Sequence, residues 1–243
     1  MDNVKTAYTD NITWAIKENG ELWGLGSNEC GKLGDGTEEN RNEPQKIMDN
    51  VRYVKDGGWY TLAITENDEL WGWGDNEYGQ LGDGTVEESL YPKKIMDDVK
   101  MVESSLKTTF AIKNNGELWV WENTECMPGP VFVRPLSTPI KLMENVKRVI
   151  TSGNDIFVIN DNDELWGWGS NFTGDMGDGT RYPVVYPNKI MDDVREVLPH
   201  NLGVLAIKNR GGNNFSIEAP TNCSVQANIL WILQSVCAII LHR

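Results

Sequence analysis

The tripeptide Glu-Leu-Trp occurs four times in this chain at an almost constant spacing. Its tryptophans are Trp23, Trp71, Trp119 and Trp166, which lie 48, 48 and 47 residues apart. A second motif keeps the same period, since "IMDNV", "IMDDV", "LMENV" and "IMDDV" begin at Ile47, Ile95, Leu142 and Ile190, and the chain starts with "MDNV". A fixed period of this length indicates structural repeats that pack on their neighbours.

Each unit predicts four short strands and no long helix. In the second unit these are "VRYVKDG", "YTLAIT", "ELWGWG" and, after a glycine-rich loop, "KKIMD". The links between the second and third strands read "ENGE", "ENDE", "NNGE" and "DNDE". The Asn-Gly copies predict type I′ turns, in which both central residues have positive φ. Four antiparallel strands per unit at this period favour β-propeller blades arranged around an axis.

The strand-loop segments resemble a known repeat. "LGSNECGKLGDGT" (25–37), "WGDNEYGQLGDGT" (73–85) and "WGSNFTGDMGDGT" (168–180) resemble the W-G-x-N-x-x-G-Q-L-G signature of the regulator of chromosome condensation repeat family. The preceding "TLAITENDELWGWG" resembles the other half of that repeat. The resemblance covers residues 1 to about 209 and implies an all-β propeller, which has seven blades in complete family members. Four units and the start of a fifth are present, so we expect an open arc.

One of the four units departs from the family pattern. The third unit has "WENTECMPGP" at residues 121–130 and lacks the signature glycines. Its outer loop is therefore expected to follow another path.

We interpret the repeated signature residues as architecture. Blade strands are covered on both faces by neighbouring blades, and Trp71 and Trp73 share one face of their strand, so we expect them to pack between blades. Asp83 in "GDGT" predicts a turn in which the side chain bonds its own backbone, because a calcium loop needs several closely spaced acids. The expected structural residues are Trp23, Trp71, Trp73, Gly74, Asn76, Gly79, Leu81, Gly82, Asp83, Trp119, Trp166 and Trp168.

The direction of the strands places the "ENDE" turn and the "MDD" junction at the same end of each blade. Repetition around the axis would gather their carboxylates into an acidic rim. The simpler interpretation is a solvated surface that resists aggregation, and the functional alternative is docking of a basic protein. The candidate partner-binding residues are Glu21, Asp49, Glu69, Asp97, Asp98, Glu117, Glu144, Glu164, Asp192 and Asp193.

Composition excludes several classes of function. The net charge of −14 opposes binding to nucleic acid or to an anionic membrane surface. The two histidines, His200 and His242, do not recur in the repeats, so no nucleophile and base are paired. We therefore expect no catalytic residue, no cofactor and no metal site. The four cysteines lack disulfide spacing and the N-terminus lacks a signal-peptide pattern, which favours a cytoplasmic location.

The end of the chain breaks the pattern. Residues 210–243 form an atypical tail in which Val225–Leu241 is largely apolar and seventeen residues long, at the lower limit for crossing a bilayer. A membrane anchor is not favoured. Two alternatives are a cap over the last blade and, slightly preferred, an out-of-frame continuation of a longer propeller. The uncovered faces and edges of an open arc predict self-association, capping by the tail or poor solubility.

The leading hypothesis for function is a non-catalytic scaffold for protein–protein interaction, because a repeat fold offers a broad rigid surface and no reactive group recurs. The resemblance implies an alternative, since the founding member of the family is a nucleotide exchange factor for the Ran GTPase and binds chromatin. The nearly constant unit lengths leave no room for the inserted wedge on which that exchange activity depends. A third hypothesis is an enzyme inhibitor that acts through the rim. Photoreception is not favoured, because only "GGWYT" (57–61) approaches the G-W-R-H-T repeats of the related plant UV-B photoreceptor, once and without the Arg or His.

Overall fold

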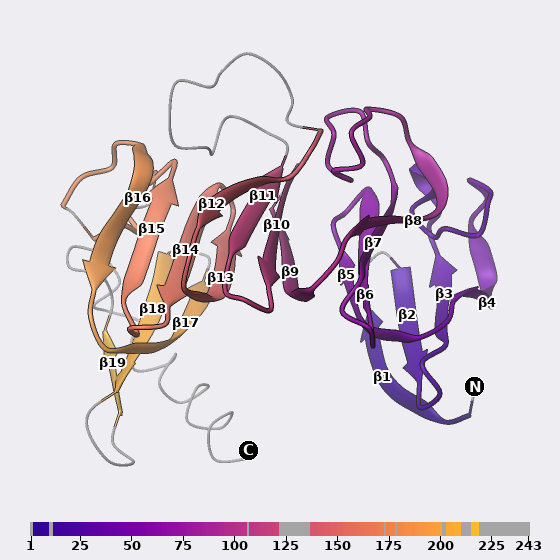
Figure 1. Ribbon diagram of the computed structural model, residues 1–243, viewed down its shortest axis with the longest axis horizontal. Helices are drawn as coiled ribbons and strands as arrows, with labels where there is room; N and C mark the ends of the chain where they lie inside the picture. Colours follow the sequence, from indigo (N-terminus) through magenta and orange to yellow (C-terminus); the bar gives the residue numbers. More distant parts are fainter. Residues whose placement is uncertain are drawn as a thin grey trace.

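The fold is a row of five antiparallel β-sheets (Figure 1). The computed structural model describes residues 2–9, 12–105, 107–121, 137–172, 174–177, 179–200, 203–209 and 215–218. Four sheets have four strands, and the fifth has three within the described residues. Apart from the strands, the elements include one 3-10 helix, η1 (Glu29–Gly31).

The strands follow the period seen in the sequence, and we call each sheet a blade. The first blade holds β1 (Val4–Thr9), β2 (Ile12–Lys17), β3 (Leu22–Gly26) and β4 (Arg41–Met48). The second holds β5 (Val51–Asp56), β6 (Tyr60–Thr65), β7 (Leu70–Gly74) and β8 (Ser89–Met96). The third holds β9 (Val99–Ser105), β10 (Thr108–Lys113), β11 (Leu118–Trp121) and β12 (Ile140–Met143). The fourth holds β13 (Val146–Ser152), β14 (Asp155–Asn160), β15 (Leu165–Gly169) and β16 (Val184–Met191), and the fifth holds β17 (Val194–His200), β18 (Gly203–Asn209) and β19 (Phe215–Glu218).

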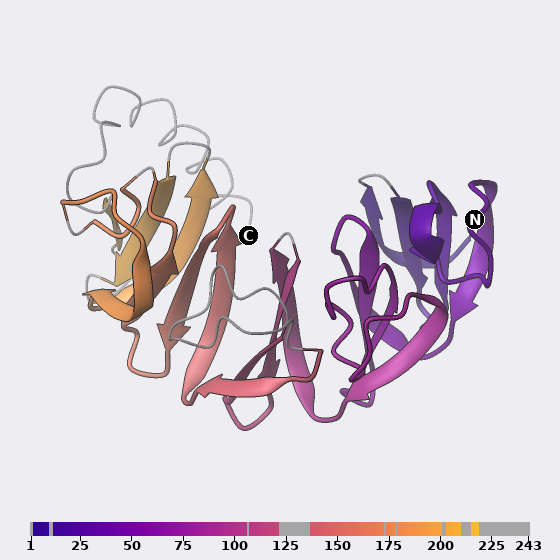
Figure 2. The ribbon, with the colours of Figure 1, turned by 90° about the horizontal axis from the view of Figure 1, so that it is seen from above.

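The blades stand side by side in an open arc, which Figure 2 shows from above. Within each sheet the strands lie in chain order. The first strands of neighbouring blades contact one another, β5 with β9, β9 with β13 and β13 with β17. The first strands therefore line the inside of the arc and the fourth strands its outside, which is the arrangement of propeller blades.

The hydrophobic core is divided into clusters that lie between successive blades. One cluster joins Ile12 and Trp14 of the first blade to Val54, Ala63 and Trp73 of the second. The second blade has neighbours on both sides, and every residue of β6 is buried. In β2, buried and half-buried residues alternate because only one face of the first blade is covered. The prediction that inner blades are covered on both faces is confirmed.

The hairpins between the second and third strands are present, but the predicted type I′ turn is wrong. Lys17 N–H donates to the carbonyl of Glu21, so three residues form the loop instead of two. Gly20 N–H donates to Lys17 O, and Gly20 has φ +81° while Asn19 has no positive φ. This is a type I turn followed by one left-handed residue. Asp68 fills the left-handed position in the second blade, with φ +60°.

The fourth strand of each four-stranded blade is an exposed edge. Pro44, Pro92 and Pro187 occupy the same repeat position in β4, β8 and β16. Proline lacks the N–H that a further strand would need, so these edges resist pairing with another chain.

Three expectations fall partly on residues outside the described set. The first is the loop of the degenerate third unit at 121–130, of which only Trp121 is described. The second is the apolar segment 225–241. The third is the boundary at residue 209, which stays a prediction. Beyond it, β19 pairs antiparallel with β18, from Asn209 opposite Phe215 to Ala206 opposite Glu218.

Candidate functional site

The turn and the junction that carry the rim acids lie at the same end of the blades. Glu66 N–H donates to Asn50 O (2.8 Å), which ties the second blade's turn to the junction before it. Val99 N–H donates to Asp68 O (2.8 Å), which ties the same turn to the junction after it. These hydrogen bonds form a continuous chain along one end of the arc.

A four-residue cluster at this end repeats in four blades, and we call it the rim clamp. In the second blade, Trp71 Nε1–H donates to Glu69 Oε2 (3.3 Å), while Lys94 Nζ contacts Glu69 Oε1 (2.7 Å) and Asp97 Oδ1 (2.7 Å). The lysine thus bridges the turn acid and the junction acid. The equivalent clamps are Trp23, Glu21, Lys46 and Asp49; Trp119, Glu117, Lys141 and Glu144; and Trp166, Glu164, Lys189 and Asp192.

The clamp shifts the pKa of its turn acid and of its lysine. Hydrogen bonds from Lys46, Trp23 and Lys17 lower the pKa of Glu21 to about 2. The pKa of Glu69 is lowered mainly by Lys94, and the pKa of Lys94 is raised mainly by Asp97. Two carboxylates and one ammonium leave one net negative charge per clamp. The rim is acidic, but its field is weaker than the acids alone would give.

Two of the predicted rim residues serve the junction turn through their backbone. Asp98 and Asp193 have φ +62° and +63°, and Asn50 and Asn145 hold the same conformation in the other blades. Asp and Asn tolerate the left-handed region better than most residues. Both aspartates are exposed.

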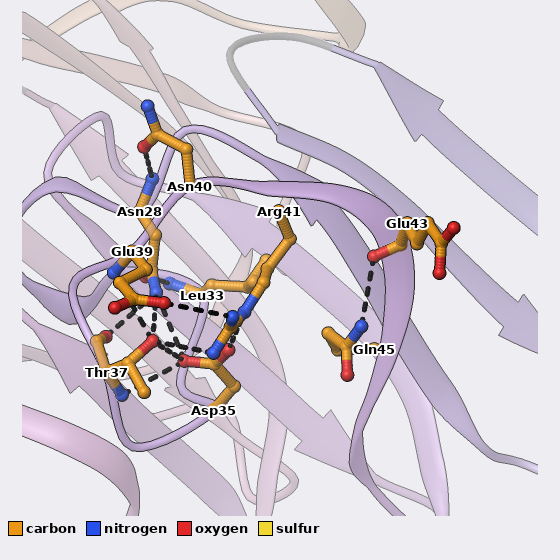
Figure 3. A network of polar contacts seen from close by, with 9 residues as sticks. All are labelled: Asn28, Leu33, Asp35, Thr37, Glu39, Asn40, Arg41, Glu43 and Gln45. Atoms are coloured by element: carbon orange, nitrogen blue, oxygen red, sulfur yellow. Dashed lines mark hydrogen bonds and ion pairs between the residues drawn. The ribbon is translucent and has the colours of Figure 1, made fainter.

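A second repeated network shapes the outer loops at the opposite end. Figure 3 shows it in the first blade, where Asn28 Nδ2–H donates to Asp35 Oδ1 (3.1 Å) and Thr37 O (2.8 Å). Leu33 N–H donates to Asn28 Oδ1 (2.8 Å), and Arg41 Nε–H donates to Asp35 Oδ2 (2.5 Å). Thr37 N–H donates back to Asp35 Oδ1 (3.0 Å), which is the self-bonded turn predicted for "GDGT". Asn76 and Asn171 occupy the same place in blades two and four.

In blades two and three, the second signature tryptophan binds the outer loop of the preceding blade. Trp73 Nε1–H donates to Lys32 O of the first blade (2.9 Å), and Thr61 Oγ1–H donates to the same carbonyl (2.7 Å). Trp121 and Thr109 bind Gln80 O of the second blade in the same way. A side chain at Gly82 would collide with the Trp121 indole, which explains that glycine. Gly36 N–H and Gly84 N–H donate in turn to Leu90 O and Ser137 O of the next blade.

This geometry agrees with a family model. The regulator of chromosome condensation (RCC1) repeat matches residues 19–64 and 67–112. These two segments of the chain are RCC1 repeats. No relative among curated proteins matches the chain.

Solved structures with RCC1-like propellers resemble the whole arc. Human WBSCR16 is 19% identical with a TM-score of 0.72, and the match covers 86% of this chain and 59% of that one. Yeast RCC1 (Prp20), in a structure with Kap60, is 20% identical with a TM-score of 0.66, over 84% and 53% of the two chains. Prp20p from Saccharomyces cerevisiae is 18% identical with a TM-score of 0.66, over 97% and 59%. These likenesses show the fold, and the chain spans little more than half the length of each propeller.

Blades two and four keep the same loop network while their exposed side chains differ. In blade two, Asn76 Nδ2–H donates to Glu87 O (3.0 Å) and Leu81 N–H donates to Asn76 Oδ1. In blade four, Asn171 Nδ2–H donates to Tyr182 O (3.1 Å) and Met176 N–H donates to Asn171 Oδ1. Glu77 and Glu87 of blade two are thus replaced by Phe172 and Tyr182, which are 70% and 77% exposed.

Sequence reasoning missed the cations of the rim end. The clamp lysine directly precedes every "IMD" or "LME" motif, which is a visible signal. A second basic residue follows the first valine of each blade, at Lys5, Arg52, Lys100, Lys147 and Arg195. Arg52 donates from Nη2–H to Val99 O (3.0 Å) and pairs with Asp68 (2.8 Å), so it joins neighbouring blades.

The inner strands also form a shallow groove of about 320 Å³. Its charges are paired, Lys55 with Glu103 (2.6 Å) and Arg148 with Glu196 (3.7 Å). The groove therefore offers no unpaired basic cluster to a ligand.

The part of the chain that the structure describes offers few groups for metal binding or nucleophilic catalysis. It holds no group of three or more His, Cys, Asp or Glu side chains that could bind a metal ion, and no helix there is long and apolar enough to cross a membrane. Burial, followed by the charge of Asp75, raises the pKa of the Cys30 thiol. A protonated thiol is a weak nucleophile.

Proposed function

We propose that this chain is a non-catalytic scaffold for protein–protein interaction, whose outer loops carry the binding specificity. The supporting observation is the contrast between blades two and four. The same asparagine network holds both loops, yet one presents Glu77 and Glu87 and the other presents Phe172 and Tyr182. Because the backbone frame is shared, the side chains alone change what the loop can contact.

The aromatic loop suits a protein partner better than solvent. Phe172 and Tyr182 expose most of their surface, and Arg181 in the same loop is also exposed. Aromatic residues and arginine dominate the binding energy of protein interfaces. We propose that this loop docks an apolar patch flanked by acidic groups on a partner protein.

The test compares two loops of one molecule. Phe172→Glu and Tyr182→Glu together place the charges of blade two on blade four, and Glu77→Ala is the matched control in blade two. Proteins captured by the wild-type chain from its source cell should be lost by the double variant and kept by the control. Equal capture by all three chains would contradict the proposal.

The acidic rim is a separate proposal for a second surface, which would favour a basic partner. Each clamp retains one negative charge, so the attraction is modest and should fall with salt. Asp49→Lys, Asp97→Lys and Asp192→Lys together should weaken capture of a basic partner at low ionic strength. Unchanged capture at low salt would remove the rim from the proposal.

Nucleotide exchange on a small GTPase is the alternative function, and a direct assay tests it. The structure of Prp20p is described together with its binding to Gsp1p and histones, which concerns that protein. If the chain is a scaffold alone, adding it to a nucleotide-loaded small GTPase will leave the rate of nucleotide release unchanged. An accelerated release would replace the scaffold proposal with exchange activity.

We also propose a cytoplasmic location, which the cysteine spacing supports. Cell fractionation of the tagged chain tests it, and recovery in a secreted or membrane fraction would contradict it.

A further inference from the structure

Blade four differs from the other blades at the base of its outer loop, where two aspartates are buried. Asp155 begins β14 and Asp175 lies in the outer loop, and each is 4% exposed. The same repeat positions hold Ile12 and Lys32 in blade one, and Tyr60 and Gln80 in blade two.

The two carboxylates differ in how they are satisfied. Asp155 Oδ1 accepts hydrogen bonds from Asn171 N–H (2.8 Å) and Ser170 Oγ–H (3.1 Å). Asp175 Oδ1 is buried and has no hydrogen-bond partner in the described part of the chain. Burying a carboxylate oxygen without a partner is costly, so a native structure that does so calls for a bound ion, a proton or a water.

Blade two provides the comparison from which we infer the direction of the Asp175 side chain. In blade two, Gln80 Nε2–H donates to Asp75 Oδ2 (2.8 Å), and Asp75 holds the position of Ser170. The loop frame is the same in both blades, because Leu81 N–H and Met176 N–H bind their asparagines equally. From this comparison we infer the same direction for Asp175, toward Ser170, whose hydroxyl contacts Asp155. Burial raises the pKa of Asp155, and the charge of Asp175 raises it further, as expected for neighbouring carboxylates.

Blade one already has a positive charge at this position. Lys32 is buried there, and its Nζ donates to Gly58 O of the next blade (3.2 Å). The same repeat position thus holds a cation directed at the next blade in blade one, and an acid in blade four.

We propose that Asp155 and Asp175 bind a divalent cation of the Ca²⁺ class between β14 and the outer loop of blade four. Carboxylate and hydroxyl oxygens are the ligands that such hard cations prefer, and the Ser170 hydroxyl and water complete the shell. Two carboxylates make a weak site, with a dissociation constant on the order of 10⁻⁴ to 10⁻³ M. Bound cation neutralises the pair and ties the loop to its blade.

The experiment uses the full chain freed of metal with a chelator. Its Tm is measured by circular dichroism as CaCl₂ is added, with MgCl₂ and NaCl at matched ionic strength as separate arms. The Tm of the wild-type chain should rise and saturate with Ca²⁺, and NaCl should not reproduce the rise. The Asp161→Asn control removes an exposed acid of the same blade and should keep the full response.

Two variants distinguish a bound cation from a shared proton or a buried water. Asp175→Asn removes the unpaired charge, so its Tm in chelator should exceed that of the wild type, and its Ca²⁺ response should vanish. Asp175→Lys installs the residue of blade one and should also abolish the response. Terbium luminescence excited through tryptophan reports binding independently of stability, and Asp175→Asn should weaken it at least tenfold.

A wild-type Tm that ignores Ca²⁺ and Mg²⁺ but rises as the pH is lowered would show that the pair shares a proton, and it would overturn the proposal. Equal Ca²⁺ responses in Asp175→Asn and wild type would overturn it as well.

Discussion

The two ends of each blade follow different rules. At the rim end, the same four kinds of side chain form the clamp in four blades, and their charges are paired with one another. At the loop end, a buried asparagine keeps the backbone constant while exposed side chains change from Glu77 to Phe172. Side chains that recur from blade to blade therefore hold the fold together. Exposed side chains that differ on the same backbone frame are the ones that can acquire different binding properties.

The largest expected effect concerns the tryptophan that joins loop to blade. Trp73→Ala removes a fully buried indole and its bond to Lys32 O, so we expect a loss of about 3–5 kcal/mol in the free energy of unfolding. Trp71→Ala at the rim end removes a half-buried ring and should cost less. Urea unfolding followed by circular dichroism measures both, and equal losses would break the contrast between the two ends.

The loop frame is the next test. Asn76→Ala leaves the buried Leu81 N–H without its acceptor, and an unsatisfied buried donor costs about 1–3 kcal/mol. Glu77→Ala changes the exposed neighbour and should stay within about 0.5 kcal/mol of wild type. If the Glu77 variant lost as much stability as the Asn76 variant, the distinction between frame and variable surface would fail.

A pair of glycines sharpens the comparison between blades. Gly36 and Gly84 have φ +87° and +86°, so alanine at either strains the backbone by about 1–2 kcal/mol. A side chain at Gly36 also meets the Tyr91 hydroxyl, whereas the nearest atom to one at Gly84 is 3.7 Å away. Gly36→Ala should therefore be the more destabilising, and Tyr91→Ala should erase the difference. A difference that persists without Tyr91 would contradict this interpretation.

The smallest effect belongs to the exposed clamp and depends on pH. The pKa of Glu21 is lowered from 4.5 to about 2, so its ionised form stabilises the folded state above about pH 4.5. That contribution is lost as the pH falls through about 2. The Tm difference between wild type and Glu21→Gln should shrink over this interval. A pH-independent difference would show that the clamp acts by packing alone.

Much of the fold follows from the sequence because strand periodicity and repeat spacing are local. The shared face of Trp71 and Trp73 and the turn at Asp83 could be predicted from local sequence in this way. The rim acids also lie at the expected end of the blades. The hydrogen-bond acceptor of Trp73 could not be predicted, because Lys32 O is a backbone atom that only the packing of two blades brings near. The turn type failed because pairing of Lys17 with Glu21 sets the loop length, and no residue preference reports that register. The clamp lysines stand in the sequence directly before each "IMD" or "LME" motif. Because lysine is common on protein surfaces, only their repetition could have indicated a structural role.

The hydrogen bonds between a loop and the next blade also depend on the order in which the chain is synthesised. The carbonyl of Lys32 precedes its partner Trp73 by 41 residues, and Gln80 precedes Trp121 by the same number. At translation rates of about 5–20 residues per second, each loop waits about 2–8 seconds for the indole that completes it. During synthesis, the loops of blades one and two therefore stay incomplete until the next blade's indole has been made.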